Sequence, residues 1–474
     1  MDFGCSSIDR IPLEVLRDVF LYHVWSNKCS PLDLLYVCKV WYSTAISTSS
    51  LWAKVTLGPT EDFKSPDRIQ CCSLKTFALA IRRAGRASLD LTISMSRLSF
   101  SKVDIDGFTK DVTSDWVSRC HSLTMRSVSA LSGGDRLLRL FYTANFVALE
   151  RLVLQGVVGP IAFEMKALFE QLEKTAFRLE SLVMGRGSSD WSVSRLPTYP
   201  GIVERLRCLE VETDGNLDLS KASLLDQLEV AVSHGGNKVL LPTDIALRQL
   251  TLANTFNFAT FDPQVYESLT HLTLYTRSWL AVNAMIPPFP SLTHLYLCVN
   301  PLEVERLYAP RLQYLSIEGL LLQPTVHGRP FILKGLTPKI LYIDRSCTEA
   351  QLVQILMQLS SRLEEVQITS TRPEHVINDK LTQFLTGGSQ MKPGIPFLKR
   401  LLLSSKAPAN PARKNAILVN LHRVRQALAV QTKLERIDYG VYIAYDKTRV
   451  ALPHERRDWP VEWIRVWSRE ASVD

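Results

Sequence analysis

Apolar residues recur along most of the chain in one short pattern. An apolar residue is followed by two other residues, a second apolar residue, one other residue and a third apolar residue, as in Leu269–Leu274. The alternation at the end of each copy predicts a short strand whose apolar side chains point into a core. Clear copies occupy residues 149–154, 179–184, 206–211, 225–230, 247–252, 269–274, 292–297, 312–317, 363–368, 398–403 and 434–439, and weaker copies occupy residues 88–93, 120–125 and 338–343.

The spacing of these copies indicates a repeat architecture. Between residues 152 and 315 their central apolar residues lie 19 to 30 residues apart, which brackets the roughly 20 to 29 residues expected for leucine-rich repeats. One strand cannot bury its apolar side chains alone, so neighbouring copies are expected to stack into a parallel sheet on the concave face of a solenoid. Apolar runs at 162–177 and 348–359 are predicted to be outer helices. The predicted fold is α/β, with an irregular leucine-rich-repeat solenoid over residues 85–440.

The first sixty residues follow a helical pattern instead. Pro12 stands at a first helical position, and a Ser-Pro pair at 30–31 opens a second helical stretch that is expected to break once. Three short helices in about fifty residues leave much apolar surface uncovered, so some of it is expected to face a partner. The apolar residues at helical spacing in the first helix are Leu13, Leu16, Phe20 and Val24.

This N-terminal segment resembles the F-box. The family motif is matched in order, at nearly its spacing, by Ile11-Pro12, Glu14-Val15-Leu16, Val19-Phe20, Leu34, Val37-Cys38, Trp41 and Leu51-Trp52. The resemblance implies a three-helix F-box over residues 8–56 that docks on the Skp-type adaptor of an SCF ubiquitin ligase, which also contains a cullin. The residues that the resemblance implies at the adaptor surface are Ile11, Pro12, Val15, Leu16, Phe20, Cys38, Trp41 and Leu51. The alternative is an ordinary three-helix cap with all these side chains turned inward.

Two flanking regions complete the predicted organisation. Residues 57–84 are expected to form a linker helix region, and residues 441–474 a C-terminal cap. In the cap, Trp459, Trp463 and Trp467 stand four residues apart and fit a final helix that would shield the end of the solenoid. An aromatic peptide-binding stripe is the alternative interpretation of these tryptophans.

Composition narrows the class of protein. The 474 residues are 46% hydrophobic and 22% charged, which is typical of soluble globular proteins and excludes collagen-like and wholly disordered chains. Nine cysteines without a CxxC pair indicate neither a disulfide framework nor a zinc site. Apolar runs are too short to span a bilayer. We therefore expect a cytoplasmic or nuclear protein that binds no membrane, no metal and no cofactor.

Catalytic motifs are missing from the sequence. The His-Gly-Gly-Asn run at 234–237 resembles an oxyanion-hole motif, but no G-x-S-x-G nucleophile motif accompanies it. The chain also lacks a phosphate-binding G-x-x-x-x-G-K-[ST] loop and an H-E-x-x-H metal motif. We therefore expect no enzymatic activity of the chain itself.

The net charge of +8 has a local origin. Residues 399–436 contain nine Lys or Arg residues and one acid, Glu435, so this segment alone nets +8. One interpretation is a site for acidic or phosphorylated segments of a target, since Arg binds phosphate oxygens bidentately. The other is a solvated helix face. Nucleic acid is disfavoured because the only ring in the segment that could stack on bases is that of His422.

Residues that alternate with the inward leucines are expected on the solvent side of the sheet. Tyrosine is enriched among interface hot spots, so a Tyr- and His-rich set there predicts a surface for a target protein. A solvated polar ladder that keeps the sheet soluble is the alternative. The predicted target-binding residues are His271, Tyr275, His294, Tyr296, Tyr314, Glu318, Tyr342, Arg400 and Arg436.

Taken together, the sequence predicts a substrate-recognition subunit of an SCF-type ubiquitin ligase. The F-box would hold the adaptor, the solenoid would hold an unknown protein substrate, and other subunits would carry out the ubiquitin chemistry. Two alternatives stay open: an interaction scaffold without adaptor binding, and a binder of nucleic acid or acidic partners through residues 399–436.

Overall fold

The computed structural model describes residues 11–26, 31–58, 68–94, 107–108, 114–126, 139–156, 162–185, 193–213, 215–232, 238–254, 261–275, 288–298, 307–318, 336–345, 349–370, 379–386, 394–406, 419–420, 422–424, 426, 436–442 and 461–468. The chain divides into two compact units. Unit 1 comprises Met1–Asp226 with Val239–Ile245, and unit 2 comprises Gln227–Lys238 with Ala246–Asp474. Both units combine parallel strands with helices, so the predicted α/β class with a long parallel sheet is confirmed.

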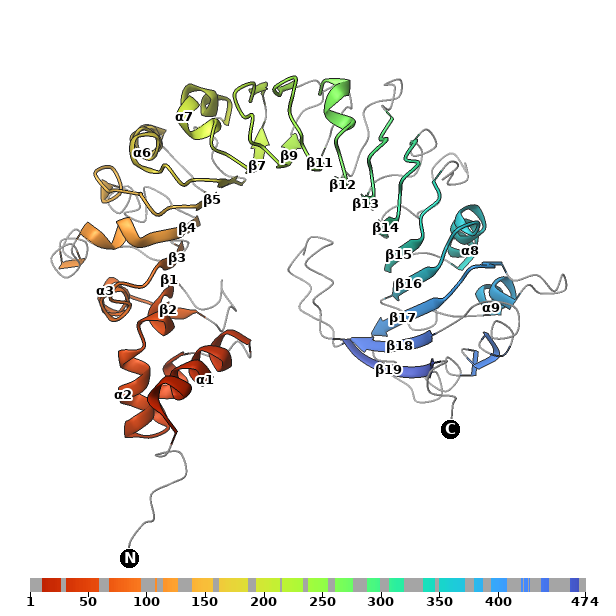
Figure 1. Ribbon diagram of the computed structural model, residues 1–474, viewed down its shortest axis with the longest axis horizontal. Coiled ribbons are helices and arrows are strands. Elements are labelled where there is room, and N and C mark those ends of the chain that lie inside the picture. Colours follow the sequence, from red (N-terminus) through yellow and green to blue (C-terminus); the bar gives the residue numbers. More distant parts are fainter. Residues whose placement is uncertain are drawn as a thin grey trace, which may run out of the picture. The chain divides into compact units, whose positions relative to one another are not determined.

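Unit 1 begins with a small helical layer, coloured red in Figure 1. It consists of α1 (Leu13–Ser26), a 3₁₀ helix (Pro31–Tyr36), α2 (Lys39–Ser47) and a second 3₁₀ helix (Ser49–Trp52). The expected break in the second helical stretch falls at Val37-Cys38. Leu16, Phe20 and Val24 form the buried stripe of α1, and the rings of Phe20 and Trp41 lie 4.8 Å apart.

The sheet of unit 1 is parallel throughout. β1 pairs with both β2 and β3, and β3 to β7 then follow in chain order. Register aligns the central leucines of the predicted repeats, so Leu123, Leu152, Leu182 and Leu209 form one column that is at most 1% exposed. The strands are β1 (Lys54–Leu57), β2 (Ile69–Cys71), β3 (Leu89–Ser94), β4 (Cys120–Arg126), β5 (Arg151–Gln155), β6 (Ser181–Met184) and β7 (Cys208–Thr213), and a separate parallel pair is β8 (Leu217–Asp218) with β10 (Val239–Leu240).

Helices lie along one side of this sheet (Figure 1). Between β5 and β6, α6 occupies residues 162–175 of the helical run predicted at 162–177, and it buries Leu168, Phe169 and Leu172. The helical elements between the strands are α3 (Leu74–Arg83), α6 (Ala162–Thr175), α7 (Pro200–Val203) and the 3₁₀ helices Ser114–Arg119 and Val193–Thr198.

Trp52 packs between the N-terminal helical layer and helix α3 next to the sheet. Its indole Nε1 donates to the Ala45 carbonyl at 2.9 Å, its ring is 2% exposed, and the Arg83 guanidinium of α3 lies 4.5 Å from the ring centroid. The backbone N–H of Asp90 on β3 donates to the Ala53 carbonyl at 2.9 Å. The helical layer is therefore packed on the first strands of the sheet.

Unit 2 carries a second parallel ladder, in which β9 and β11 to β18 pair in chain order. The central column runs through Leu250, Leu272, Leu295 and Leu315, each at most 1% exposed, and each full burial contributes roughly 1.5 to 3 kcal/mol. The strands are β9 (Gln227–Val232), β11 (Gln249–Asn254), β12 (His271–Tyr275), β13 (His294–Cys298), β14 (Tyr314–Glu318), β15 (Ile340–Arg345), β16 (Glu365–Ser370), β17 (Arg400–Lys406), β18 (Arg436–Tyr442) and β19 (Val461–Ser468).

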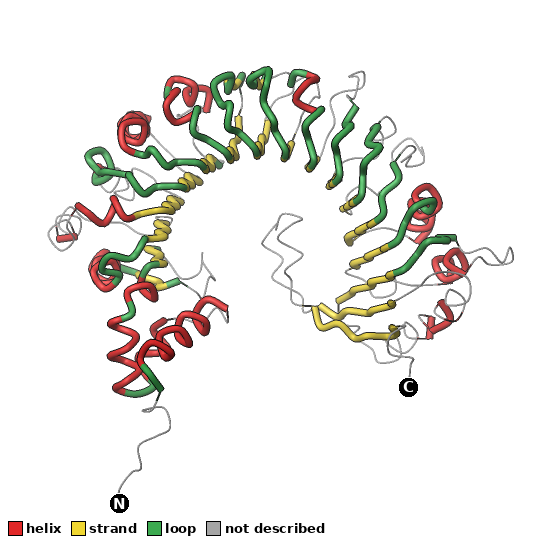
Figure 2. The backbone as a smooth tube through the Cα atoms, viewed as in Figure 1, coloured by secondary structure: helices red, strands yellow, loops and turns green. Residues whose placement is uncertain are grey.

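In unit 2 the strands form one row, and the helices and loops that join them form a second row beside it (Figure 2). The helical elements are a 3₁₀ helix (Pro263–Tyr266), α8 (Glu349–Leu359) and α9 (Asp379–Thr386). The second predicted outer helix, at 348–359, thus corresponds to α8. Within the described ranges, no helix is long and apolar enough to cross a bilayer.

The structure corrects two predictions about the ends of the sheet. Residues 461–468 are not a final helix but the strand β19, which pairs antiparallel with β18. The sheet also begins before residue 85, because β1 and β2 pair within it. Among the described residues of the predicted linker helix region at 57–84, α3 is the helical part. An exposed edge strand has unpaired backbone groups, and pairing with β19 satisfies those of β18.

Candidate protein-interaction surfaces

The first helix carries two apolar stripes. One is the buried stripe already described, and the other contains Val15, Val19 and Tyr22, which are 49%, 48% and 69% exposed. These three residues follow the i, i+4, i+7 spacing of one helix face, which lies away from the buried one. An amphipathic surface helix normally has polar residues on its solvent side.

Exposed apolar side chains concentrate in this helical layer. Among the described residues, eight of the seventeen exposed large hydrophobic side chains fall between residues 11 and 42. A concentration of exposed apolar side chains in one small layer is typical of a protein-binding site. We call this set the helical surface, and its residues are Ile11, Leu13, Val15, Val19, Tyr22, Tyr36, Val37 and Tyr42.

The residues predicted to dock the adaptor divide into two groups. Ile11, Pro12, Val15 and Cys38 are exposed, and Trp41 is half-buried against Phe20. A correction applies to the other three, which the structure places in the core. Leu16, Phe20 and Leu51 are at most 2% exposed, so they position the helical surface and do not contribute to it.

A ladder of rings crosses three adjacent strands of unit 2. Register aligns His271 of β12 with His294 of β13 and Tyr314 of β14. The two imidazoles stack 4.2 Å apart with 10° between their planes, and the rings of His294 and Tyr314 lie 5.6 Å apart. Tyr296 joins from the next column, 5.4 Å from Tyr314. We call His271, His294, Tyr296 and Tyr314 the ring ladder, and all four are half-buried.

Neighbouring threonines hold both imidazoles in place. The Thr270 and Thr293 hydroxyls each hydrogen-bond a carbonyl of the preceding repeat, at 3.1 and 3.0 Å. Each hydroxyl oxygen also lies 2.9 Å from the Nδ1 of the following histidine. The two stacked rings are therefore anchored to the backbone of the preceding repeats through these threonines.

Other predicted target-binding residues differ in position. Tyr342 is half-buried on β15, in register with Ser316 of β14. The side chains of Tyr275, Glu318 and Arg436 lie outside the described residues, although register aligns their backbone positions with the same columns. The ring ladder thus brings four of the predicted residues into one surface.

The basic strand ends near residue 400 are paired with acids. Arg400 Nη2 lies 2.5 Å from Glu365 Oε2 on β16, and Lys399 Nζ lies 2.6 Å from Glu364 Oε2. Two of the nine cations in the 399–436 segment are therefore offset locally, a feature that the count of charges along the sequence did not predict. Beyond β17 and up to β18 the segment is mostly outside the described residues, except for short helical pieces in which Arg423 is exposed.

Replacing Glu364 with Gln should change stability in acid. The hydrogen bond from Lys399 lowers the pKa of Glu364, so the folded state binds a proton less readily than the unfolded chain. The contribution of this pair is present at neutral pH and is lost as pH falls through the folded-state pKa. The free energy of unfolding is measured with denaturant at neutral pH and at a pH below the ordinary glutamate pKa. On acidification it should therefore fall by less in Glu364→Gln and in Lys399→Met than in the wild type. An unaltered acid profile in both variants would contradict this pairing.

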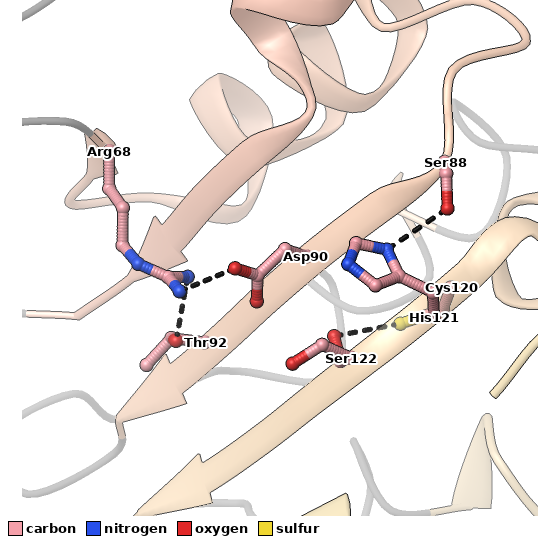
Figure 3. Close-up of polar contacts among 7 residues, drawn as sticks. All are labelled: Arg68, Ser88, Asp90, Thr92, Cys120, His121 and Ser122. Atoms are coloured by element: carbon pink, nitrogen blue, oxygen red, sulfur yellow. Dashed lines mark hydrogen bonds and ion pairs between the residues drawn. The ribbon is translucent and has the colours of Figure 1, made fainter. Parts of the chain in front are cut away.

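Unit 1 has a polar cluster on the strand faces (Figure 3). Arg68 binds Asp90 at 2.6 Å and Thr92 at 3.1 Å, which ties the start of β2 to β3. Ser88 Oγ lies 3.0 Å from Nδ1 of His121. These contacts join neighbouring strands, which is a structural role.

The Cys120 thiol next to His121 is not activated. It donates to the Ser122 carbonyl at 3.2 Å (Figure 3), and burial raises its pKa. A nucleophilic cysteine needs the opposite shift. Within the described part of the chain, no cluster of three His, Cys, Asp or Glu side chains is placed to hold a metal ion.

Sequence reasoning missed the outward stripe of α1 as a separate feature. Its signal was present in the i, i+4, i+7 spacing of Val15, Val19 and Tyr22, beside the stronger inward pattern. Comparison with known proteins adds no assignment, because no protein-family model and no curated protein matches the chain.

Proposed function

We propose that the chain is the substrate-recognition subunit of an SCF-type ubiquitin ligase. Its helical layer would act as an F-box that docks a Skp-type adaptor and, through it, a cullin. The repeats would form a leucine-rich-repeat solenoid that holds a target protein, and other subunits would transfer ubiquitin. The contribution of this subunit to the rate would be the proximity and orientation of the target.

The observation that carries the proposal is the second apolar stripe of α1. Val15, Val19 and Tyr22 leave about half or more of their apolar surface exposed to water, which a soluble protein normally avoids on one helix face. A bound partner would remove this apolar area from water. The order and spacing of the F-box-like residues name the adaptor as that partner, in a cytoplasmic or nuclear setting.

The ring ladder supports the second half of the proposal. Half-buried tyrosines and histidines present large, rigid and amphipathic contact area, and tyrosine is enriched among binding hot spots.

Adaptor binding distinguishes this proposal from the alternatives. An interaction scaffold would bind a target through the ring ladder but would not bind the adaptor. The charge-driven alternative is weakened by the ion pairs of Lys399 and Arg400.

Thiol labelling tests the proposed docking surface directly. Cys38 and Cys72 are exposed, whereas Cys71 is buried and burial raises its pKa to about 11. We expect a maleimide at neutral pH to modify Cys38 and Cys72 and to leave Cys71 unmodified. Purified Skp-type adaptor should slow the labelling of Cys38 at least about tenfold, with Cys72 as the internal control, as followed by mass spectrometry. Equal labelling of Cys38 with and without saturating adaptor would contradict docking at this surface.

A further inference from the structure

The two histidines of the ring ladder lie so close together that a charge on one affects the other. The imidazoles of His271 on β12 and His294 on β13 are 4.2 Å apart, with 10° between their planes. Imidazole takes up a proton in mild acid, at an ordinary pKa of about 6.5. One charged ring can stack on a neutral ring, but two unit charges at this distance repel each other by more than the thermal energy even in water. The second proton is therefore harder to add than the first.

Tyr314 favours one of the two rings as the first site of protonation. Its ring lies 5.6 Å from that of His294, with 28° between the planes, and register places β14 on the opposite side of β13 from β12. An aromatic face within about 6 Å of a cation attracts it. On the other side of His271, the residue in register on β11 is Gln249. The tyrosine ring therefore favours His294 as the first site.

The threonine contacts are compatible with charged rings. The Thr270 and Thr293 hydroxyls can accept a hydrogen bond from Nδ1–H of the following histidine while they donate to a backbone carbonyl. An imidazolium carries a proton on both nitrogens, so proton uptake keeps this arrangement. Two charged rings could move apart only by breaking these contacts to the preceding repeats.

The charged residues around the pair were compared with this close contact. Arg248, on the β11 side, and Arg311, on the β14 side, are exposed and add positive charge. Glu229 lies two strands from His271, which is roughly 10 Å in a sheet and more than twice the separation of the rings. Phenols ionise only near about pH 10, so the ladder tyrosines stay uncharged in acid. Further acids are Glu267, exposed in the turn before β12, and Glu318 of β14, whose side chain lies outside the described residues.

We propose that His271 and His294 form a proton switch in the ring ladder: His294 takes up the first proton with the stack intact, and a second proton, on His271, opens the stack. The ladder is therefore intact at neutral pH and is lost in acid. The protons come from solvent and return to it, so the switch is reversible. Its use in holding a target rests on the proposed function, whereas the coupling of the two protons does not depend on adaptor docking.

Histidine hydrogen–deuterium exchange of the full chain, followed by mass spectrometry, tests the coupling. The exchange rate of the imidazole C2 proton follows the protonation state of each ring, and His271 and His294 are measured on separate peptides after digestion. Between about pH 4 and about pH 9, His294 should reach half-protonation at least about one pH unit above His271. Equal midpoints, or the reverse order, would contradict the proposed order of protonation.

Substitutions then locate the coupling. His294→Gln removes the neighbouring charge, so the titration midpoint of His271 should rise by about one pH unit. Tyr314→Leu removes the ring face and should lower the midpoint of His294 by about half a unit, whereas Tyr314→Phe keeps the face and should leave it unchanged. Thr251→Ala, at a solvent-side position of β11, is the matched control and should change neither midpoint.

The pH dependence of stability provides a second measurement. Because the folded stack resists the second proton, the unfolded chain binds more protons below the ordinary histidine pKa. The denaturant midpoint of the wild type should therefore fall on acidification from about pH 7.5 to about pH 5, and it should fall by less in His294→Gln. Each chain is compared with itself at the two pH values, so a constant loss of stability from the substitution does not affect the result.

The outcomes separate this inference from the proposed function. The inference is overturned if the His271 midpoint is the same in the wild type and in His294→Gln, or if both chains lose equal stability in acid. Adaptor binding is titrated on the same preparations at neutral pH. Uncoupled histidines with intact adaptor binding remove only this inference, and coupled histidines without adaptor binding remove only the ligase function.

Discussion

Replacing Val15 and Val19 together with Asp is expected to abolish adaptor binding without unfolding the protein. Both side chains are about half exposed, so they contribute little to the core. At an interface each Asp would bury an unpaired charge, and we expect the affinity to fall at least about a hundredfold. In the free chain the free energy of unfolding should change by about 0.5 kcal/mol or less.

The matched control for this variant is Leu79→Asp. Leu79 is a similarly exposed apolar residue, 40% accessible, on α3 outside the helical surface. It should keep wild-type adaptor affinity in the same titration. If Leu79→Asp weakened binding as much as the double variant, general loss of surface hydrophobicity would explain the effect, and docking through α1 would be wrong.

Replacing Phe20 with Ala is expected to lower the stability of the fold without removing a contact to the adaptor. Phe20 is fully buried and contacts the ring of Trp41 at 4.8 Å, so truncation leaves a cavity inside the helical layer. Large-to-small substitutions of this kind cost about 3 to 5 kcal/mol. Denaturant unfolding followed by tryptophan fluorescence should show this loss in the transition that reports the helical layer.

Tyr22→Ala provides the comparison for Phe20→Ala on the same helix. Tyr22 is 69% exposed, and its removal should change the free energy of unfolding by about 0.5 kcal/mol or less. It should weaken adaptor binding, whereas Phe20→Ala should weaken binding only as far as it unfolds the layer. A Phe20→Ala variant as stable as Tyr22→Ala would contradict the assignment of inward and outward stripes.

The local pattern of apolar residues predicted the strands well, because every second residue of a strand is buried. The copies at 269–274 and 292–297 became β12 and β13 with their leucines in one buried column. β1 and β2 were missed because Lys54–Leu57 and Ile69–Cys71 are too short to carry the full signature. Their pairing depends on the neighbouring β3, which a local pattern does not encode.

The C-terminal strand shows how tertiary context overrides a helical spacing. Trp459, Trp463 and Trp467 are four residues apart, yet the segment 461–467 consists mostly of the β-branched and aromatic residues that favour strands. β18 would otherwise present unpaired backbone groups, and antiparallel pairing with β19 provides their partners. The open edge of a sheet is a property of the whole fold, so the sequence pattern alone favoured the helix.

The sequence predicted which residue types make up the candidate surfaces, but it predicted less well which of their side chains are exposed. The tyrosines and histidines of the ring ladder followed from alternation, and their positions on aligned strands agree with it. On α1, apolar residues occupy both faces, so helical spacing could not decide that Phe20 is inward and Val19 outward. The ion pairs of Lys399 and Arg400 join residues about 35 positions apart, which the charge count could not reveal.

The central claim is tested most directly by titrating the purified full chain with a purified Skp-type adaptor in a calorimeter. The account predicts saturable one-to-one binding at about micromolar affinity or tighter for the wild type. It also predicts no measurable binding for Val15→Asp with Val19→Asp, although this variant unfolds like the wild type. Absence of wild-type binding at adaptor concentrations of about 100 µM, or undiminished binding by the double variant, would contradict the claim.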